Sequence, residues 1–471
     1  MDRPKQAVVV IHGIGEQRPM ETLRSFVEAI LPDTLENAQT KCRSKPDRMA
    51  ESFELRCLQI PSHRASHRPI TEFYEYYWAH HMLDSKYGSV LSWLGNLLVR
   101  PFRRIPAGLR PVYFVTYAGL LLAAAILAWG LLDQAGQSFM VRLVSLYEKK
   151  QLYVAVAVFA AQAIGSRFIL GYVADAARYL TPSPGNIDAR NKIRAEGIEL
   201  LRALHESKKY FRIIVVGHSL GSVIGYDILR HLWVDLRKSH DPHPLKQSQA
   251  EEFDAVASCL QKDKAPVAAS KVEAFQQKQH SLWREHRAVG IPWLVTDFIT
   301  LGSPLTHATL LMADSPETFD QRKIEFEFPC CPPVTIQDIH YLKKYDPIDQ
   351  PHSISIRIPH HGALFASTRW TNLFFPYRMC ILGDLIGGPI ARNFGNGIRD
   401  VAVRPSGGGF IRKTIYSHVC YWKSAGTESE ESEGKGPEVD CLKALKSAMR
   451  LESLHSRRKW PEPTQLRVGG R

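Results

Sequence analysis

The sequence lacks several patterns that would place a protein in a class at once. Its eight cysteines include no C-x-x-C pair, and the adjacent Cys330 and Cys331 are poorly placed to pair with each other. No secretory-signal pattern opens the chain, because the apolar run at residues 7–11 is short and turn residues follow directly. No histidine or cysteine cluster has the spacing of a metal site. We therefore expect reduced thiols in a cytosolic compartment, and no metal or other cofactor.

Acidic residues are scarce relative to basic ones. The chain has 60 Lys and Arg against 47 Asp and Glu, a formal net charge of +13. It shows no DNA- or RNA-binding motif and no repeat of basic and aromatic residues, so we expect no nucleic-acid partner. A basic surface explains the charge, and attraction to an anionic membrane is the alternative. The 471 residues, 45% of them hydrophobic, fit one large globular domain with insertions, or two domains.

The most specific pattern present is FRIIVVGHSLGS at residues 211–222. A run of β-branched and aromatic residues ends in GHSLG, and apolar residues with helical spacing follow at once. This order predicts a strand, a sharp turn and a helix, with Ser219 at a strained backbone angle in the turn. A serine hydroxyl is a weak nucleophile. It needs a base, an acid that orients the base, and backbone donors for an oxyanion.

A second glycine-rich turn lies near the start of the chain. Residues 6–11, QAVVVI, have the continuous apolar character of a strand buried in a parallel sheet, and HGIG follows. Such a turn can direct backbone N–H groups at a substrate oxygen, so the expected oxyanion donors are near Ile14 and at Leu220. His12 within this turn is expected to brace the loop; a role as catalytic base is the alternative.

Two further residues complete the expected site. Residues 370–375, WTNLFF, predict a strand that leads to a glycine-rich loop containing Asp384, the expected acid. Residues 415–422, IYSHVCYW, predict the last strand, with the base His418 at its centre. Other acids and histidines compete with these two for the same roles: Asp346, Asp349, His340, His352, His360 and His361.

Together these patterns resemble the α/β-hydrolase superfamily, particularly its lipase-like and esterase-like members. The resemblance is carried by HGIG, GHSLGS, TLGSPL, the aspartate loop after WTN, and SHVCYW, within residues 1–95 and 185–425. It implies a doubly wound, mostly parallel sheet and an acyl-enzyme intermediate. It also implies a triad of Ser219 as nucleophile, Asp384 as acid and His418 as base.

An apolar pair of segments interrupts this pattern. Residues 112–132 contain 21 residues without charge, which at about 1.5 Å per residue match the hydrocarbon core of a bilayer. Residues 152–171 are a weaker candidate, with a buried helix as the alternative. Basic flanks at both outer ends predict a multi-pass protein with a two-helix membrane hairpin and its catalytic domain on the cytoplasmic side.

The expected organisation is therefore an interrupted domain. Residues 1–95 and 181–425 form the hydrolase domain, and residues 96–180 form the hairpin insertion. Residues 240–290 form a polar helical insertion and candidate lid, and residues 426–471 a disordered loop, a short helix and a basic tail. Residues 73–83, FYEYYWAHHML, predict an aromatic helix, on which the adjacent His80 and His81 would point to different faces and form no metal pair.

We expect from the sequence a membrane-anchored serine hydrolase that cleaves carboxylic esters of lipids or other acylated hydrophobic substrates. A catalytically inactive membrane-bound scaffold that uses the same fold is one alternative. A soluble esterase whose apolar pair forms a helical cap is another. No pattern indicates an oligomeric state.

Overall fold

The structure is a computed structural model in which the chain divides into two compact units. One comprises Met1–Ser85 and Tyr179–Arg471, and the other Lys86–Arg178. In the second unit only scattered helical residues between positions 110 and 128 are described. In the first unit the described residues are 5–13, 18–31, 42–50, 52–63, 67–82, 179, 186–239, 242, 246–263, 267–313, 315–336, 338–345, 353–378, 382–406, 411–423 and 438–451.

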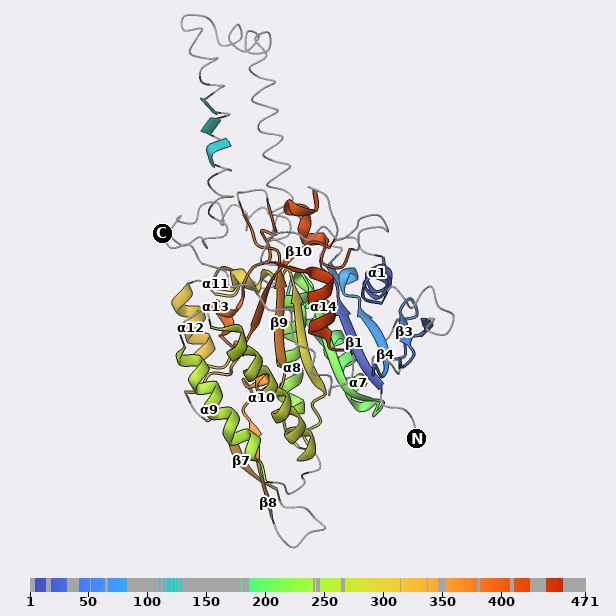
Figure 1. Ribbon diagram of the computed structural model, residues 1–471, viewed down its shortest axis with the longest axis vertical. Helices are drawn as coiled ribbons and strands as arrows, with labels where there is room; N and C mark the ends of the chain where they lie inside the picture. Colours follow the sequence, from blue (N-terminus) through green and yellow to red (C-terminus); the bar gives the residue numbers. More distant parts are fainter. Residues whose placement is uncertain are drawn as a thin grey trace, which may run out of the picture. The chain divides into compact units, whose positions relative to one another are not determined.

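The described residues of the first unit form a nine-stranded, mostly parallel sheet (Figure 1). Within this sheet two of the described strand pairs are antiparallel, β2 with β3 and β3 with β4. The prediction of an α/β protein with a mostly parallel sheet is confirmed. In spatial order the strands are β11 (Val439–Asp440), β10 (Arg399–Arg404), β9 (Arg369–Phe374), β6 (Val295–Leu301), β5 (Tyr210–His218), β1 (Lys5–Ile11), β4 (Ile70–Tyr76), β3 (Arg56–Ile60) and β2 (Arg43–Pro46).

Helices cover both faces of this sheet. Helices α1 (Glu21–Ile30) and α14 (Cys441–Met449) share one apolar core with Val8 and Val10 of β1. Since side chains alternate along a strand, Ile11 of β1 faces the opposite side, where it lies close to Gly225 of α8 (Leu220–Leu236). Helix α7 (Ile187–Glu206) packs against α8.

The remaining elements surround this core. The longer ones are α9 (Ser248–Lys262), α10 (Ala269–Ala288), α12 (Pro316–Ile324) and an antiparallel pair, β7 (His340–Tyr345) and β8 (Ile354–Pro359). The short ones are α11 (Ala308–Leu311), α13 (Ala391–Phe394) and the 3₁₀ turns η1 (Ala79–Met82), η3 (Pro304–His307), η4 (Leu364–Ala366), η5 (Ile411–Lys413) and η6 (Ile415–Val419).

The predicted aromatic helix at residues 73–83 is wrong. Its first part belongs to β4, which pairs in parallel with β1, and η1 follows. The physical reason is that Phe and Tyr favour strands, and that β4 is buried along nearly its whole length, so both of its faces accept apolar side chains.

The predicted last strand at residues 415–422 is also wrong. His418 lies on the 3₁₀ turn η6. The strand that pairs with β9, expected at residues 415–422, is β10. The strand β10, RDVAVR, has only three consecutive apolar residues between charged ends, so it lacks the longer apolar run expected of a strand buried in a parallel sheet.

None of the described helices combines the length and the apolar composition needed to cross a bilayer. This finding contradicts the predicted membrane hairpin. A spanning helix needs about 20 predominantly apolar residues. Helices α7 and α10 have 20 residues each, but both are rich in charged side chains. The expected multi-pass membrane location is therefore wrong by this finding. Residues 112–132 lie largely, and residues 152–171 wholly, outside the described residues.

The polar segment at residues 240–290 contains the helices α9 and α10, as its composition predicts. One face of α10 is buried. Its Gln279 side chain donates to the backbone oxygens of Phe365 and Thr368, and Gln276 donates to that of Trp370. These contacts attach α10 to the amino end of β9.

The C-terminal helix is part of the core. Cys441, Leu445 and Met449 of α14 are fully buried against the sheet, so residues 441–449 belong to the folded unit. Seven cysteines are described, and all seven are free thiols.

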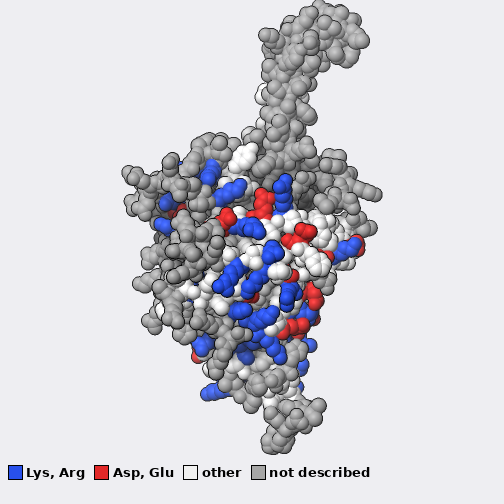
Figure 2. Space-filling view, turned by 90° about the vertical axis from the view of Figure 1, so that its right-hand side faces the viewer, with Lys and Arg blue, Asp and Glu red and all other residues white. Residues whose placement is uncertain are grey.

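Part of the basic charge lies at one edge of the sheet. Among the charged side chains of the described residues on the face seen in Figure 2, Lys and Arg cover more of the surface than Asp and Glu. Arg43 and Lys45 are exposed on the edge strand β2. Charged side chains on an edge strand oppose pairing with a second chain, so part of the positive charge protects this edge.

A buried carboxyl in β4 makes stability depend on pH. Glu75 is 1% exposed, its Oε2 accepts from Met20 N, and its Oε1 has no hydrogen-bond partner among the described residues. Burial raises the pKa of Glu75 from 4.5 to about 7, although the Met20 N–H opposes the shift. A carboxyl whose folded pKa is raised binds more protons when folded, so folding loses stability as pH rises from the unfolded pKa through the folded one.

We expect Glu75 to lower the free energy of unfolding by about 3 kcal/mol between pH 5 and pH 8. The Glu75→Gln variant should lack this contribution, because its side chain does not titrate. Urea denaturation of both proteins at a series of pH values measures the difference. Equal pH slopes in the two proteins would contradict the assignment.

Candidate active site

The turn between β5 and α8 has the backbone geometry of a nucleophile elbow. Ser219 has φ 50° and ψ −127°, a left-handed φ that few residues other than glycine adopt. The turn also needs close approach, since a Cβ on Gly221 would lie 2.3 Å from the backbone oxygen of Ile11. The predicted strand, turn and helix are confirmed here, and the strain is stored at Ser219.

Three residues that lie far apart in the sequence form one hydrogen-bonded chain. His418 Nε2 is 2.8 Å from Ser219 Oγ, and His418 Nδ1 is 2.8 Å from Asp384 Oδ2. A carboxylate only accepts hydrogen bonds, so Nδ1 carries the proton and Nε2 is free to accept the Ser219 hydroxyl proton. All three side chains are buried, with exposed fractions of 1% or less.

The Asp384 carboxylate is held by several donors. Oδ1 accepts from Ile386 N at 2.8 Å, and Oδ2 accepts from the Tyr421 hydroxyl at 2.8 Å as well as from His418. Burial by itself raises the pKa of Asp384, but His418, the Gly387 N–H and Tyr421 together lower it below its usual value. Asp384 is therefore an ionised carboxylate that fixes the orientation and tautomer of His418.

The turn after β6 packs closely against the Asp384 carboxylate. Gly302 has φ +56°, and a Cβ there would lie 2.6 Å from the Tyr421 ring and 2.8 Å from Asp384 Oδ2. Ser222 Oγ donates to the backbone oxygen of Ser219 and accepts from the hydroxyl of Ser303, whose Oγ is 2.7 Å away, which ties the two turns together. The motifs GHSLGS and LGSPL contain these residues, so the sequence held the signal for this contact.

His218 and Tyr421 contact the other residues of the site, and the sequence patterns gave neither of them a role. His218 Nε2 is 2.8 Å from the backbone oxygen of His418, so it donates to that oxygen and holds the backbone of η6. Burial, followed by the charge of His418, lowers the pKa of His218 to about 3, so this ring is neutral. Tyr421 follows His418 by three residues in SHVCYW, a spacing that brings both side chains to Asp384.

The HGIG turn lies beside the serine. A Cβ on Gly13 would lie 2.8 Å from Ser219 Cβ. His12 Nδ1 donates to Gly13 O at 2.8 Å, its ring stacks on Trp78 with centroids 5.2 Å apart, and burial lowers its pKa to about 4. These contacts are those of a residue that braces the loop.

Of the two predicted oxyanion donors, Leu220 lies within the described residues and Ile14 does not. Leu220 is the first residue of α8, where a backbone N–H has no acceptor within the helix and lies at the positive end of its dipole. Ile14 lies outside the described residues.

The competing residues are elsewhere or outside the described part of the chain. His340 Nδ1 is 2.8 Å from Asp254 Oδ1, and its Nε2 is 3.1 Å from His286. His360 and His361 pack around the Phe326 ring. The residues outside the described ranges are Asp346, Asp349 and His352.

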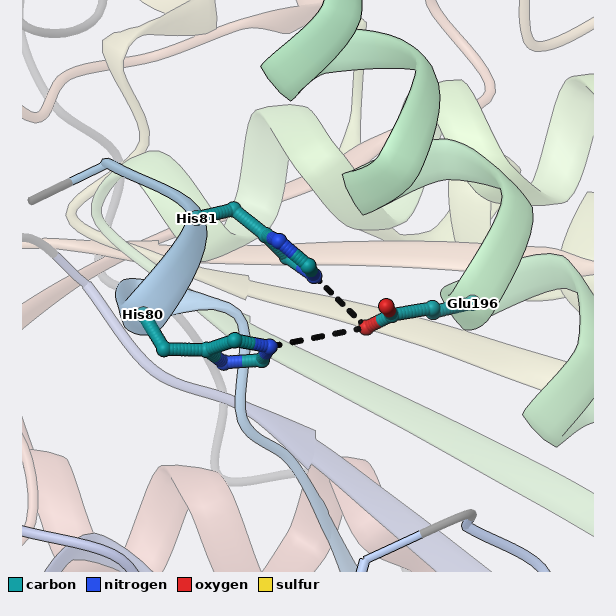
Figure 3. A group of neighbouring side chains, drawn as sticks. All are labelled: His80, His81 and Glu196. Atoms are coloured by element: carbon teal, nitrogen blue, oxygen red, sulfur yellow. Dashed lines mark hydrogen bonds and ion pairs between the residues drawn. The ribbon is translucent and has the colours of Figure 1, made fainter. Parts of the chain in front are cut away.

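Comparison with protein-family models, with curated proteins and with solved structures finds no match for this chain. The assignment of the site therefore rests on its own geometry. Within the described residues, one group of His and carboxylate side chains lies close enough to share a metal ion. It consists of His80, His81 and Glu196 (Figure 3).

Proposed function

We propose that this protein is a serine hydrolase of the α/β-hydrolase fold that cleaves carboxylic esters through an acyl-enzyme intermediate. The single observation that carries the proposal is the hydrogen-bonded chain from Ser219 Oγ through His418 to Asp384. A hydroxyl, an imidazole and an ionised carboxylate in this order can produce an activated nucleophile.

The position of each residue in the sheet supports the fold assignment. Ser219 follows β5, Asp384 follows β9 and His418 follows β10, and these three strands are parallel to their neighbours. The carboxyl ends of parallel strands lie at one edge of a sheet, which is where open α/β sheets bind their ligands. The chain order of serine, acid and histidine is the one used by α/β-hydrolases.

The proposed reaction has two stages. His418 Nε2 removes the Ser219 proton as Oγ attacks the ester carbonyl carbon, and the Leu220 N–H stabilises the negative charge on the carbonyl oxygen. His418 then gives the proton to the departing alcohol, which leaves an acyl group on Ser219. Water, deprotonated by His418, attacks this acyl group. Loss of Ser219 as the leaving group yields the carboxylic acid and restores the enzyme.

The substrate class within this proposal is the carboxylic ester of a hydrophobic acyl group, as in lipids. A series of p-nitrophenyl esters with increasing acyl length tests this part separately. A rise of kcat/KM with acyl length supports it. A steady fall with length contradicts the hydrophobic substrate class, while ester hydrolysis itself stands.

A fluorophosphonate probe tests the nucleophile directly, because it phosphonylates only activated serines. We expect one adduct on the wild-type chain, located by peptide mass spectrometry on Ser219 and absent from the nearby Ser222. The His418→Ala variant should label far more slowly, because its serine has no base.

The matched control for this experiment is His361→Gln, which changes an exposed histidine whose ring packs against Phe326. It should label like the wild type. An unlabelled wild-type chain, under conditions in which a known serine hydrolase reacts, would overturn the proposed enzyme and favour a binding role for the fold.

A further inference from the structure

Two imidazoles and a carboxylate meet on the surface of the first unit, in a group that the proposed reaction does not use. His81 Nε2 is 2.7 Å from Glu196 Oε2, and His80 Nε2 is 3.9 Å from the same oxygen (Figure 3). The prediction that these histidines diverge assumed an α-helix. They lie instead on the 3₁₀ turn η1, and their ring centroids are 3.8 Å apart.

The donor atoms have the separation that a small transition-metal ion needs. One ligand atom from each residue lies within 4.8 Å of the other two. In a tetrahedral zinc site with bonds of about 2.0–2.1 Å, ligand atoms lie about 3.3 Å apart. The two distances to Glu196 Oε2, 2.7 and 3.9 Å, bracket that separation. Small side-chain rotations are therefore enough to complete the site.

The backbone that carries the three side chains is held in place by other contacts. The Tyr76 hydroxyl, at the end of β4, donates to the backbone oxygen of Ile193 in α7, three residues before Glu196. Trp78 Nε1 donates to the backbone oxygen of His12 at 3.0 Å. The two ligand-bearing elements thus meet without an ion, and a site whose ligands are already positioned loses little entropy when the ion binds.

We propose that His80, His81 and Glu196 bind one divalent transition-metal ion, with zinc as the best fit. Two imidazole nitrogens and one carboxylate oxygen are ligands that Zn²⁺ prefers, and water would take the fourth position.

This site is separate from the proposed ester hydrolysis, but rings connect it to the HGIG turn. The His80 ring stacks on Tyr77 with centroids 5.7 Å apart, and Tyr77 contacts the His12 ring at 5.3 Å. An ion bound to η1 and α7 would hold this row of rings, and with it His12 of the HGIG turn.

The test is a metal titration of the full chain after treatment with a chelator. Competition between the protein and a chromophoric chelator for Zn²⁺ gives the stoichiometry and the affinity, and the visible absorption of bound Co²⁺ reports the ligand geometry. We expect one equivalent of Zn²⁺ on the wild type. Loss of an outer-sphere partner of a metal site costs about 10–100-fold in affinity, so His81→Ala and Glu196→Gln, which remove ligands, should each cost at least about 100-fold.

Matched controls are available on the same surface. Glu199→Gln changes a carboxylate on α7 that pairs with Arg202, and His361→Gln changes a remote exposed histidine. Both should bind Zn²⁺ like the wild type. Because His80 and Glu196 are exposed and His81 is only partly buried, the ligand variants should fold, which circular dichroism verifies. Equal affinity in the wild type and in Glu196→Gln, or no bound ion in the wild type, would overturn the proposal.

Discussion

Replacement of Ser219 by alanine is expected to lower kcat for hydrolysis of a p-nitrophenyl ester by at least about 10⁴-fold. The reason is that the carbonyl carbon loses its nucleophile, while His418 and Asp384 stay in place. Alanine keeps the Cβ of serine, so the strained backbone at φ 50° is unchanged and the fold should persist. Initial rates at saturating substrate measure the effect, and circular dichroism verifies the fold.

The matched control is Ser417→Ala, which removes a buried hydroxyl next to His418 in the sequence. Ser417 Oγ has no hydrogen-bond partner among the described residues, so its loss leaves no donor or acceptor unsatisfied. This variant should hydrolyse the ester at a rate within about threefold of the wild type. A threefold change in rate corresponds to less than about 1 kcal/mol in activation free energy. Hydrolysis by Ser219→Ala at the rate of the control would rule out Ser219 as the nucleophile.

The Asp384→Asn variant is expected to lower kcat by about 10⁴-fold with the fold intact. Asp384 Oδ1 accepts from Ile386 N, so the amide oxygen of asparagine must take that position, and its NH₂ group must face His418. An N–H facing Nδ1 forces that nitrogen to accept. Nε2 then carries the ring proton and cannot take the proton of Ser219.

Initial rates and fluorophosphonate labelling both measure this effect. Asp235→Asn serves as the control, because Asp235 lies on the exposed side of α8 and pairs with Arg202. Both rates should fall in Asp384→Asn and neither in Asp235→Asn. If Asp384→Asn retained wild-type rates, the orienting acid would have to be another residue, and Asp346 and Asp349 would be the next variants to make.

Several features could be predicted from local sequence because local physics decides them. The four residues before GHSLG, IIVV, are continuously apolar, so they form the buried part of β5, and Gly221 allows the turn into α8. The strands β1 and β9 were also predicted, from QAVVVI and WTNLFF. The chain order of serine, acid and histidine was also legible, because it needs only residue types and their sequence.

Other features depend on partners that are distant in the sequence. The segment FYEY forms the second half of β4, whose neighbours β1 and β3 come from other parts of the sequence. His418 was predicted to lie on a strand. It lies on η6, and β10, whose apolar run is only three residues long, takes the place beside β9. The turn η1 likewise places His80 and His81 on one side, where an α-helix would separate them.

The sequence by itself therefore determined the class of the fold, the strand and turn around Ser219, and the residue types available for its chemistry. Only the tertiary structure decided which aspartate and which histidine meet the serine, that Tyr421 and Gly302 complete the surroundings of Asp384, and that Glu196 faces two adjacent histidines. The physical reason is range. Propensity and periodicity act over a few residues, whereas hydrogen bonds between residues 34 and 199 positions apart exist only after the sheet has brought its strand ends together.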